Sequence, residues 1–107
     1  GKRGPQLVRA ETLVKLTTPV IDVPAGKDAA PGTPSRGRYA FGWAEVQYAW
    51  AKEPFLFHGG SNGMNLAHIF LQPKNDFAMV LMTNIGGQKA DEAFRALAEE
   101  LYKRYGK

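Results

Sequence analysis

The sequence predicts an α+β protein in which an antiparallel sheet is flanked by an N-terminal and a C-terminal helix. Between residues 38 and 84, short apolar runs alternate with turn-forming residues, as in successive antiparallel strands. Residues 89–105 instead repeat their apolar side chains three and four positions apart, which is the spacing of one helix face. With 107 residues and 44% hydrophobic residues, the chain can form one domain with a real core.

Composition excludes several classes of function. The formal net charge is +4, but the basic residues are spread out, and no basic run with interleaved aromatic residues predicts a nucleic-acid partner. The chain has no cysteine, so it has no disulfide framework, thiol nucleophile or thiolate metal ligand. No apolar stretch approaches the ~18 residues of a membrane span. We therefore expect no cofactor, no nucleic acid and no membrane span.

The N-terminal part of the chain predicts a short helix and then a loop. Apolar residues in 7–16 recur at helical spacing, and Pro19 disfavours helical geometry in the residue before it, so we expect the helix within 1–19. Proline and glycine then punctuate a polar stretch without periodicity. We expect 20–37 to be a long surface loop.

The strands are expected between 38 and 84. In 38–50, Tyr39, Phe41 and Trp43 alternate with small residues, which predicts one strand with its aromatic side chains on a single face. Further strands are predicted at 55–57, 65–71 and 77–84, with a turn at 72–76 because proline, asparagine and aspartate favour turn geometry. The interpretation is four antiparallel strands.

The last of these strands is apolar on both faces, whereas a single C-terminal helix can cover only one. We therefore expect that a segment absent from these 107 residues covers the second face.

The stretch 58–63, His-Gly-Gly-Ser-Asn-Gly, is the candidate site. A phosphate-binding loop would be followed by a helix, but the next segment is a predicted strand. A metal site is disfavoured because His58 and His68 are the only histidines and lack a ligand spacing. The string Gly59-Gly60-Ser61-Asn62-Gly63 matches a nucleophile elbow, again without the helix. From these residues alone, a glycine-rich hairpin turn with a packed histidine remains an equal alternative.

A series of motifs along the chain narrows these alternatives. They are, in order, Tyr39-Ala-Phe41-Gly42-Trp43, His58-Gly59-Gly60-Ser61, Gly63, Pro73, an apolar strand ending in Thr83-Asn84, and an amphipathic helix. In this order and spacing they resemble the C-terminal portion of the serine beta-lactamase-like family. That family includes class C beta-lactamases, D-alanyl-D-alanine carboxypeptidases and related esterases. The resemblance covers essentially the whole chain.

The resemblance implies the C-terminal part of a beta-lactamase/transpeptidase-like fold, with a site lined by three motifs. These are Ser-x-x-Lys with the acylated serine, Tyr-x-Asn or a variant, and Lys-Thr-Gly or His-x-Gly on a sheet strand. His58 takes the position of the third motif's cation and Gly59 that of its hydroxyl residue. Gly60 leaves room for substrate to lie along the strand.

By the same resemblance, the backbone amide of Ser61 is the second oxyanion donor, so His58 and Ser61 are the candidate catalytic residues. Asn62 and Gly63 would form the rim of the site. Asn84 either reaches the substrate or caps a turn, and the turn role is favoured. The candidate substrate-binding residues are Gly59, Gly60, Asn62, Gly63 and Asn84.

Two departures from the family pattern matter. The third motif lacks both the fixed positive charge and the hydroxyl that would hold a beta-lactam carboxylate, which favours an esterase, amidase or peptidase. Neither Ser-x-x-Lys nor Tyr-x-Asn occurs in the sequence: Ser35 and Ser61 both lack a lysine three residues later. The resemblance therefore implies that the nucleophile lies outside this chain.

The resemblance thus implies a C-terminal fragment of a serine hydrolase that is inactive without its N-terminal part. Its expected partners are that N-terminal segment or chain and a small ester, amide or peptide substrate. The resemblance implies a periplasmic or secreted location. Two alternatives remain open: a non-catalytic peptide- or partner-binding module of the same fold, and an unrelated small α+β domain.

Overall fold

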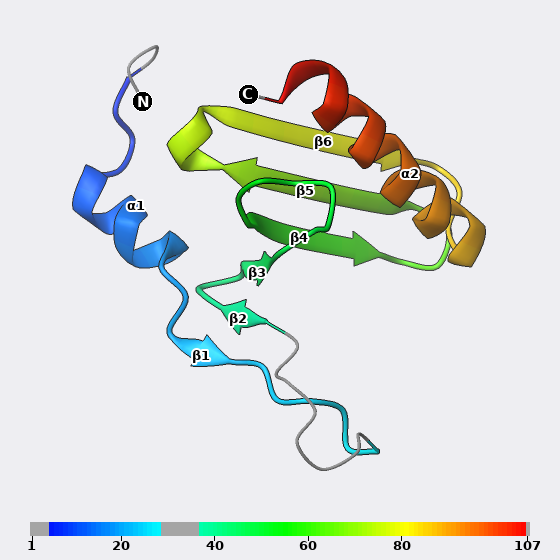
Figure 1. Cartoon of the computed structure of the whole chain (residues 1–107), viewed down its shortest axis with the longest axis horizontal. Coiled ribbons are helices and arrows are strands. Elements are labelled where there is room, and N and C mark those ends of the chain that lie inside the picture. The colour runs from blue at the N-terminus through cyan, green and yellow to red at the C-terminus, as the bar shows by residue number, and fades with distance from the viewer. Residues whose placement is uncertain (1–4, 29–36, 107) are drawn as a thin grey trace.

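A computed structural model describes residues 5–28 and 37–106 (Figure 1). The described residues form one antiparallel sheet in the order β1-β2-β3-β4-β5-β6 with a helix at each end, which confirms the predicted α+β class. The elements are α1 (Ala10–Thr17), β1 (Ile21–Asp22), β2 (Arg38–Tyr39), β3 (Ala44–Val46), β4 (Phe55–Ser61), β5 (Leu66–Gln72), the 3₁₀ turn η1 (Pro73–Asn75), β6 (Phe77–Thr83) and α2 (Gln88–Tyr105).

The three long strands β4, β5 and β6 form the body of the sheet. β4 pairs with β5 from Leu56↔Leu71 to Ser61↔Leu66, and β5 continues against β6 to Leu66↔Thr83. The turn between β5 and β6 is η1, which Asp76 closes in the left-handed conformation at φ 50°. Aspartate tolerates this conformation better than most residues, so the turn follows directly from its sequence.

The segment 38–50 differs from its predicted form. β2 ends at Tyr39, the N–H of Ala40 donates to the carbonyl of Trp43 at 2.8 Å, and β3 begins at Ala44. Gly42 reverses the chain at φ +79°, a conformation that glycine adopts without steric cost. The prediction of one aromatic-faced strand is therefore wrong, because the glycine that fitted the alternation is a turn residue.

The predicted loop 20–37 also needs correction, because part of it is in the sheet. Ile21 and Asp22 form β1 and pair with Tyr39 and Arg38 of β2. A guanidinium nitrogen of Arg38 also donates to the carbonyl of Pro19 at 3.0 Å. Residues 29–36 of the predicted loop, which include Ser35, lie outside the described residues, as do residues 1–4 of the predicted N-terminal helix.

The helices differ in how they pack. α1 is shorter than the predicted 1–19 segment and has no buried residue, although it carries exposed apolar side chains such as Leu13 and Val14. α2 begins one residue before its expected range and crosses in front of β5 and β6 (Figure 1). Neither helix of the described chain has both the length and the apolar character that a membrane crossing needs.

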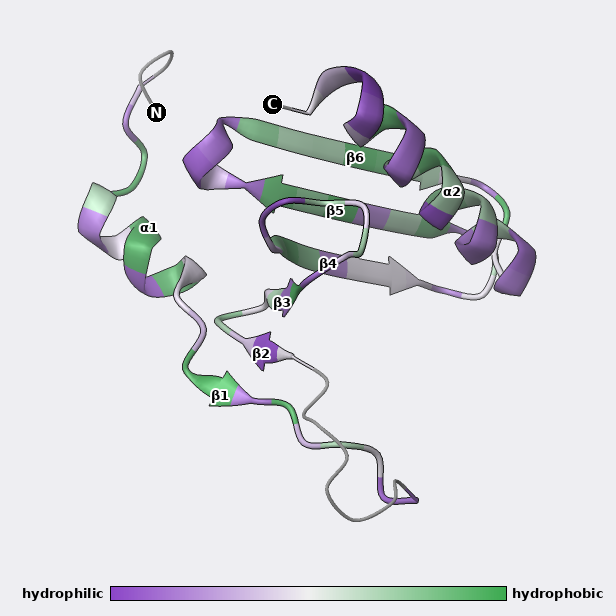
Figure 2. Ribbon diagram, viewed as in Figure 1, coloured by the Kyte–Doolittle hydropathy of each residue, from purple (hydrophilic) through white to green (hydrophobic). Residues whose placement is uncertain are grey.

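The core lies between α2 and one face of the sheet. It is built on the fully buried Phe55 and Phe70, and Tyr102 of α2 meets the ring of Phe55 with the centroids 5.5 Å apart. β6 is hydrophobic along most of its length (Figure 2), but its side chains alternate between two environments. Leu81 is buried under α2, whereas Met82 on the other face is 76% exposed. The helix α2 therefore covers one face of a sheet that is apolar on both faces.

Candidate functional site

The second half of β4 has a free edge. β3 pairs with β4 only from Val46↔Phe55 to Ala44↔Phe57, whereas β5 pairs with β4 as far as Ser61. Among the described residues, no strand pairs with the outer edge of 58–61. Backbone N–H and C=O groups on such an edge can pair with an extended segment or with an oxyanion. The structure thus extends the predicted 55–57 strand through the two glycines, which have no Cβ to resist a close approach.

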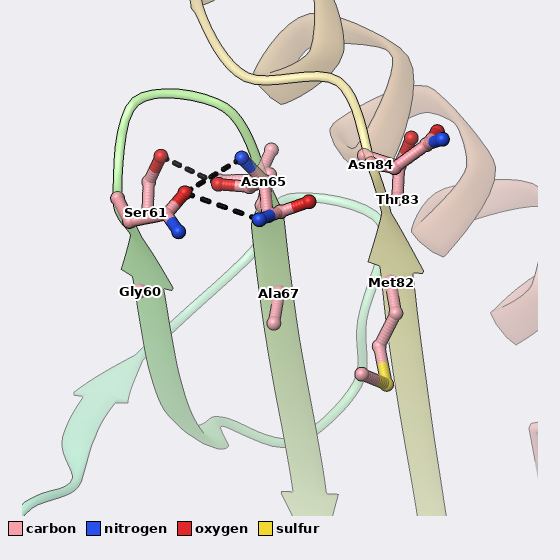
Figure 3. A pocket seen from close by; sticks show the side chains of 9 residues that line it. Gly60, Ser61, Asn65, Ala67, Met82, Thr83 and Asn84 are labelled. Atoms are coloured by element: carbon pink, nitrogen blue, oxygen red, sulfur yellow. Dashed lines mark hydrogen bonds between the residues drawn. The ribbon is translucent and has the colours of Figure 1, made fainter.

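The β4–β5 turn is held by its own side chains (Figure 3). The hydroxyl of Ser61 donates to the carbonyl of Asn65 at 2.6 Å. It also accepts from the N–H of Gly63 at 3.1 Å. The side-chain oxygen of Asn62 accepts from the backbone N–H groups of Met64 and Asn65 at 3.1 and 2.8 Å. These contacts make Ser61 and Asn62 turn-forming residues, and they leave the Ser61 hydroxyl bonded to backbone groups rather than to a general base.

A surface hollow of about 530 Å³ lies beside this turn, and it brings four of the candidate residues together. They are Gly60, Ser61, Asn62 and Asn84. Ala67 of β5 and Met82 of β6 also line the hollow. The side chain of Asn84 points away from the β4–β5 turn in Figure 3. His58, Gly59 and Gly63 do not line this hollow.

His58 is directed toward the β2–β3 turn. Its Nδ1 lies 2.6 Å from the carbonyl oxygen of Gly42, so this nitrogen carries the proton and donates. The ring also meets Trp43 edge-on, with the ring centroids 6.3 Å apart. The short hydrogen bond anchors the imidazole at the start of the free edge. This contact could not be read from the sequence, because Gly42 was expected within a strand.

His68 is the functional candidate that sequence reasoning passed over. It lies opposite Gly59 in the β4–β5 register and is 7% exposed. Its Nε2 lies 3.4 Å from a carboxylate oxygen of Asp91 on α2. Both residues line a second cavity, of about 710 Å³, between β4 and α2. The only sequence signal was a histidine in an apolar strand, which gave no indication of its partner.

The electrostatics of this second cavity favour a neutral imidazole. Burial lowers the pKa of His68 below its ordinary value of 6.5, Asp91 opposes that shift, and Arg95 reinforces it. Arg95 in turn pairs with Asp91 at 2.8 Å. Within residues 5–28 and 37–106, no three His, Asp or Glu side chains gather as a metal site would need.

Comparisons with family models, with curated proteins and with solved structures return no match to this chain. The proposed function therefore rests on the free strand edge, on the β4–β5 turn, called the rim turn below, and on the two cavities, together with the sequence motifs.

Proposed function

We propose that the chain is the C-terminal part of a serine hydrolase related to the beta-lactamase-like family, acting on an ester or amide. The observation that carries this proposal is the edge of 58–61, which no strand of residues 5–28 and 37–106 pairs with and which lies beside the β4–β5 turn and a surface hollow. An acyl-transfer site needs such rigid donors aimed at the developing oxyanion. The N–H of Ser61 is the donor that we assign to this role.

In the proposed reaction, a serine on the N-terminal part attacks the carbonyl carbon of the substrate. Its hydroxyl proton passes to a base on the same part, and the alcohol or amine leaves as the acyl-enzyme forms. Water then hydrolyses the acyl-enzyme and releases the acid. This chain supplies the oxyanion donor and the strand along which the substrate lies. The His-Gly-Gly sequence at 58–60 favours an esterase, amidase or peptidase over a beta-lactamase.

The second sheet face supports an N-terminal partner. Val80 and Met82 of β6 are 59% and 76% exposed, and they form an apolar surface with Ile69 of the neighbouring strand β5. Burial of apolar surface stabilises by about 25 cal/mol per Å², so an uncovered face of this kind favours a covering segment. The N-terminal part of the same hydrolase, carrying Ser-x-x-Lys, is the occupant that we propose.

The test begins with the gene. The reading frame upstream of the Gly1 codon is sequenced, and the complete protein is expressed and treated with a fluorophosphonate probe. We expect covalent labelling of a serine in a Ser-x-x-Lys motif, with acyl-ester turnover that falls when His58 is changed to Ala. A matched control is Glu92→Ala, an exposed change on α2. An upstream sequence without Ser-x-x-Lys, or a protein that the probe does not label, would contradict the proposal.

A non-catalytic binding module is the second candidate, and the same free edge favours it. An extended peptide can add to an exposed strand edge through main-chain hydrogen bonds. This function predicts reversible, saturable binding of an extended peptide by the 107-residue chain, without an adduct. Covalent labelling of the complete protein by the probe would rule it out as the sole function.

A further inference from the structure

The ring of His68 lies next to Gly59 of β4, on the face of the sheet that α2 covers. Gly59 and His68 are opposite each other in the β4–β5 register. A Cβ placed on Gly59 would lie 2.9 Å from Cδ2 and 3.3 Å from Nε2 of His68. The imidazole therefore occupies part of the space that a side chain at position 59 would need. A displacement of the ring would be transmitted to the strand edge.

The ring is held from several sides. Phe57 and Phe94 meet it edge-on at centroid distances of 5.0 and 5.2 Å, with interplanar angles of 81° and 73°. Asp91 contacts Nε2, and Arg95 fixes the other carboxylate oxygen of Asp91 at 2.8 Å. The imidazole thus connects the first turn of α2 with the middle of β4.

The hydrogen bonding of this ring depends on its protonation. With a proton on Nε2 that faces Asp91, Nδ1 is an acceptor that is buried and has no hydrogen-bond partner in the described part of the chain. A second proton would turn Nδ1 into a buried donor without an acceptor, which is unfavourable. The other charged or titratable groups that line the cavity are Tyr48, between β3 and β4, and Arg95 and Glu99 of α2. Burial raises the pKa of Tyr48, so this phenol stays neutral in the range where His68 titrates.

We propose that His68 is a positioning residue. Its neutral imidazole, oriented by Asp91, supports Gly59 on the α2 face of the sheet. Protonation of the imidazole displaces the backbone of residues 59–61. The physical part of this inference concerns the chain by itself. Its relevance to catalysis rests on the proposed function, in which the Ser61 N–H of that edge is the oxyanion donor. The structure assigns His68 no contact with substrate.

The test follows the backbone amides of Gly59, Gly60 and Ser61 by nuclear magnetic resonance as the pH is lowered from 8 to 4. We expect the amide shifts to move with the same midpoint as the carbon-bound protons of the His68 ring. Asp91→Asn should lower that midpoint and Arg95→Gln should raise it, because Asp91 raises and Arg95 lowers the pKa of His68. Glu92→Gln, on the same helix but exposed, is the matched control and should leave the midpoint unchanged.

His58 adjoins Gly59 and is the second imidazole near this edge, so His58→Gln is the second control. The amide transition at 59–61 should persist in His58→Gln and disappear in His68→Gln. The inference would be overturned if the amide shifts of the unmodified chain do not follow the His68 midpoint. It would also be overturned if the amide transition disappears in His58→Gln. If His68→Gln does not fold, the opposite displacements in Asp91→Asn and Arg95→Gln decide the question by themselves.

Stability gives an independent readout of the same pair. Because the folded-state pKa of His68 is lowered, the unfolded chain binds this proton more readily. The stabilisation is fully present above the ordinary pKa of about 6.5 and is lost as the pH falls from there to the folded-state pKa. His68→Gln should remove this slope from the free energy of unfolding. These measurements do not depend on turnover. They can therefore confirm or refute the positioning role of His68 even if the proposed hydrolase function fails.

Discussion

At the residue scale, the two glycines of β4 have opposite surroundings. Gly59 faces the α2 side of the sheet, where a Cβ would lie 2.9 Å from His68 and 3.0 Å from Phe57. A Cβ on Gly60 would have no neighbour within 4 Å. Successive residues of a strand point to opposite faces, which explains the difference. A hydroxyl residue at position 59, where the resemblance places one, would therefore require the rings of His68 and Phe57 to shift, whereas Gly60 borders open space.

This difference predicts unequal effects of two identical substitutions. Gly59→Ala should lower the free energy of unfolding by about 1–3 kcal/mol, because the added methyl overpacks a site closed by two rings. Gly60→Ala should leave stability unchanged or raise it by up to about 1 kcal/mol, since alanine restricts the unfolded chain. Urea denaturation of both variants at pH 7 measures the difference. Equal losses in the two variants would show that the ring of His68 does not limit position 59.

At the element scale, two loops meet at the same end of the sheet as the candidate site. Gly86, between β6 and α2, approaches the β4–β5 turn so closely that an added Cβ would overlap the carbonyl of Gly63 and lie 3.2 Å from the nitrogen of Met64. These atoms belong to the backbone, so they cannot move aside by a change of rotamer. The position of the rim turn is thus coupled to the loop that leads into α2.

Gly86→Ala should therefore displace the rim turn and lower the free energy of unfolding by about 1–3 kcal/mol. Gly26→Ala is the matched control, because a Cβ on Gly26 has no neighbour within 4 Å. Thermal denaturation gives the stability, and the amide shifts of Asn62 and Gly63 report the displacement of the rim. A Gly86→Ala protein with unchanged stability and unchanged shifts at these amides would disprove the coupling of the two loops.

At the scale of the whole molecule, the two faces of the sheet are unequal. The face beneath α2 holds the buried core, whereas the opposite face leaves apolar side chains of β6 exposed. Figure 1 places α1 beside the sheet rather than over it, and this helix has no buried residue. In the part of the chain that the structure describes, a helix therefore covers only one face of the sheet. The occupant proposed for the open face is the N-terminal part of the hydrolase.

Neighbouring residues of β6 test this asymmetry. Leu81→Ala should lower the free energy of unfolding of the 107-residue chain by about 2–5 kcal/mol, because Leu81 is only 7% exposed. Val80→Lys should change it by no more than about 0.5 kcal/mol, since Val80 is 59% exposed. In the complete protein, the same Val80→Lys change should be strongly destabilising, because it would bury an unpaired charge. A mild effect of Val80→Lys in the complete protein would show that this face stays open.

Local chemistry was sufficient to predict several parts of the structure. The apolar repeat of the last helix predicted α2, because side chains three and four apart share a helix face. Proline, asparagine and aspartate at 72–76 predicted the turn between β5 and β6 for a similar reason. The period-two pattern of 38–44 was misleading, since alternation does not reveal that Gly42 reverses the chain. The family resemblance and the roles derived from it stay predictions.

The sequence by itself determined the α+β class, the strand at 55–57 that leads into the candidate residues, and the imbalance between one covering helix and a last strand that is apolar on both faces. These features depend on patterns among near neighbours in the chain. Only the tertiary structure decided that no described strand pairs with the edge of 58–61, that His58 bonds to Gly42, and that His68 lies between Gly59 and Asp91. The unpaired edge follows from where β3 stops pairing with β4, and the two contacts join residues that are separated in the sequence. Patterns among near neighbours in the chain cannot specify any of these features.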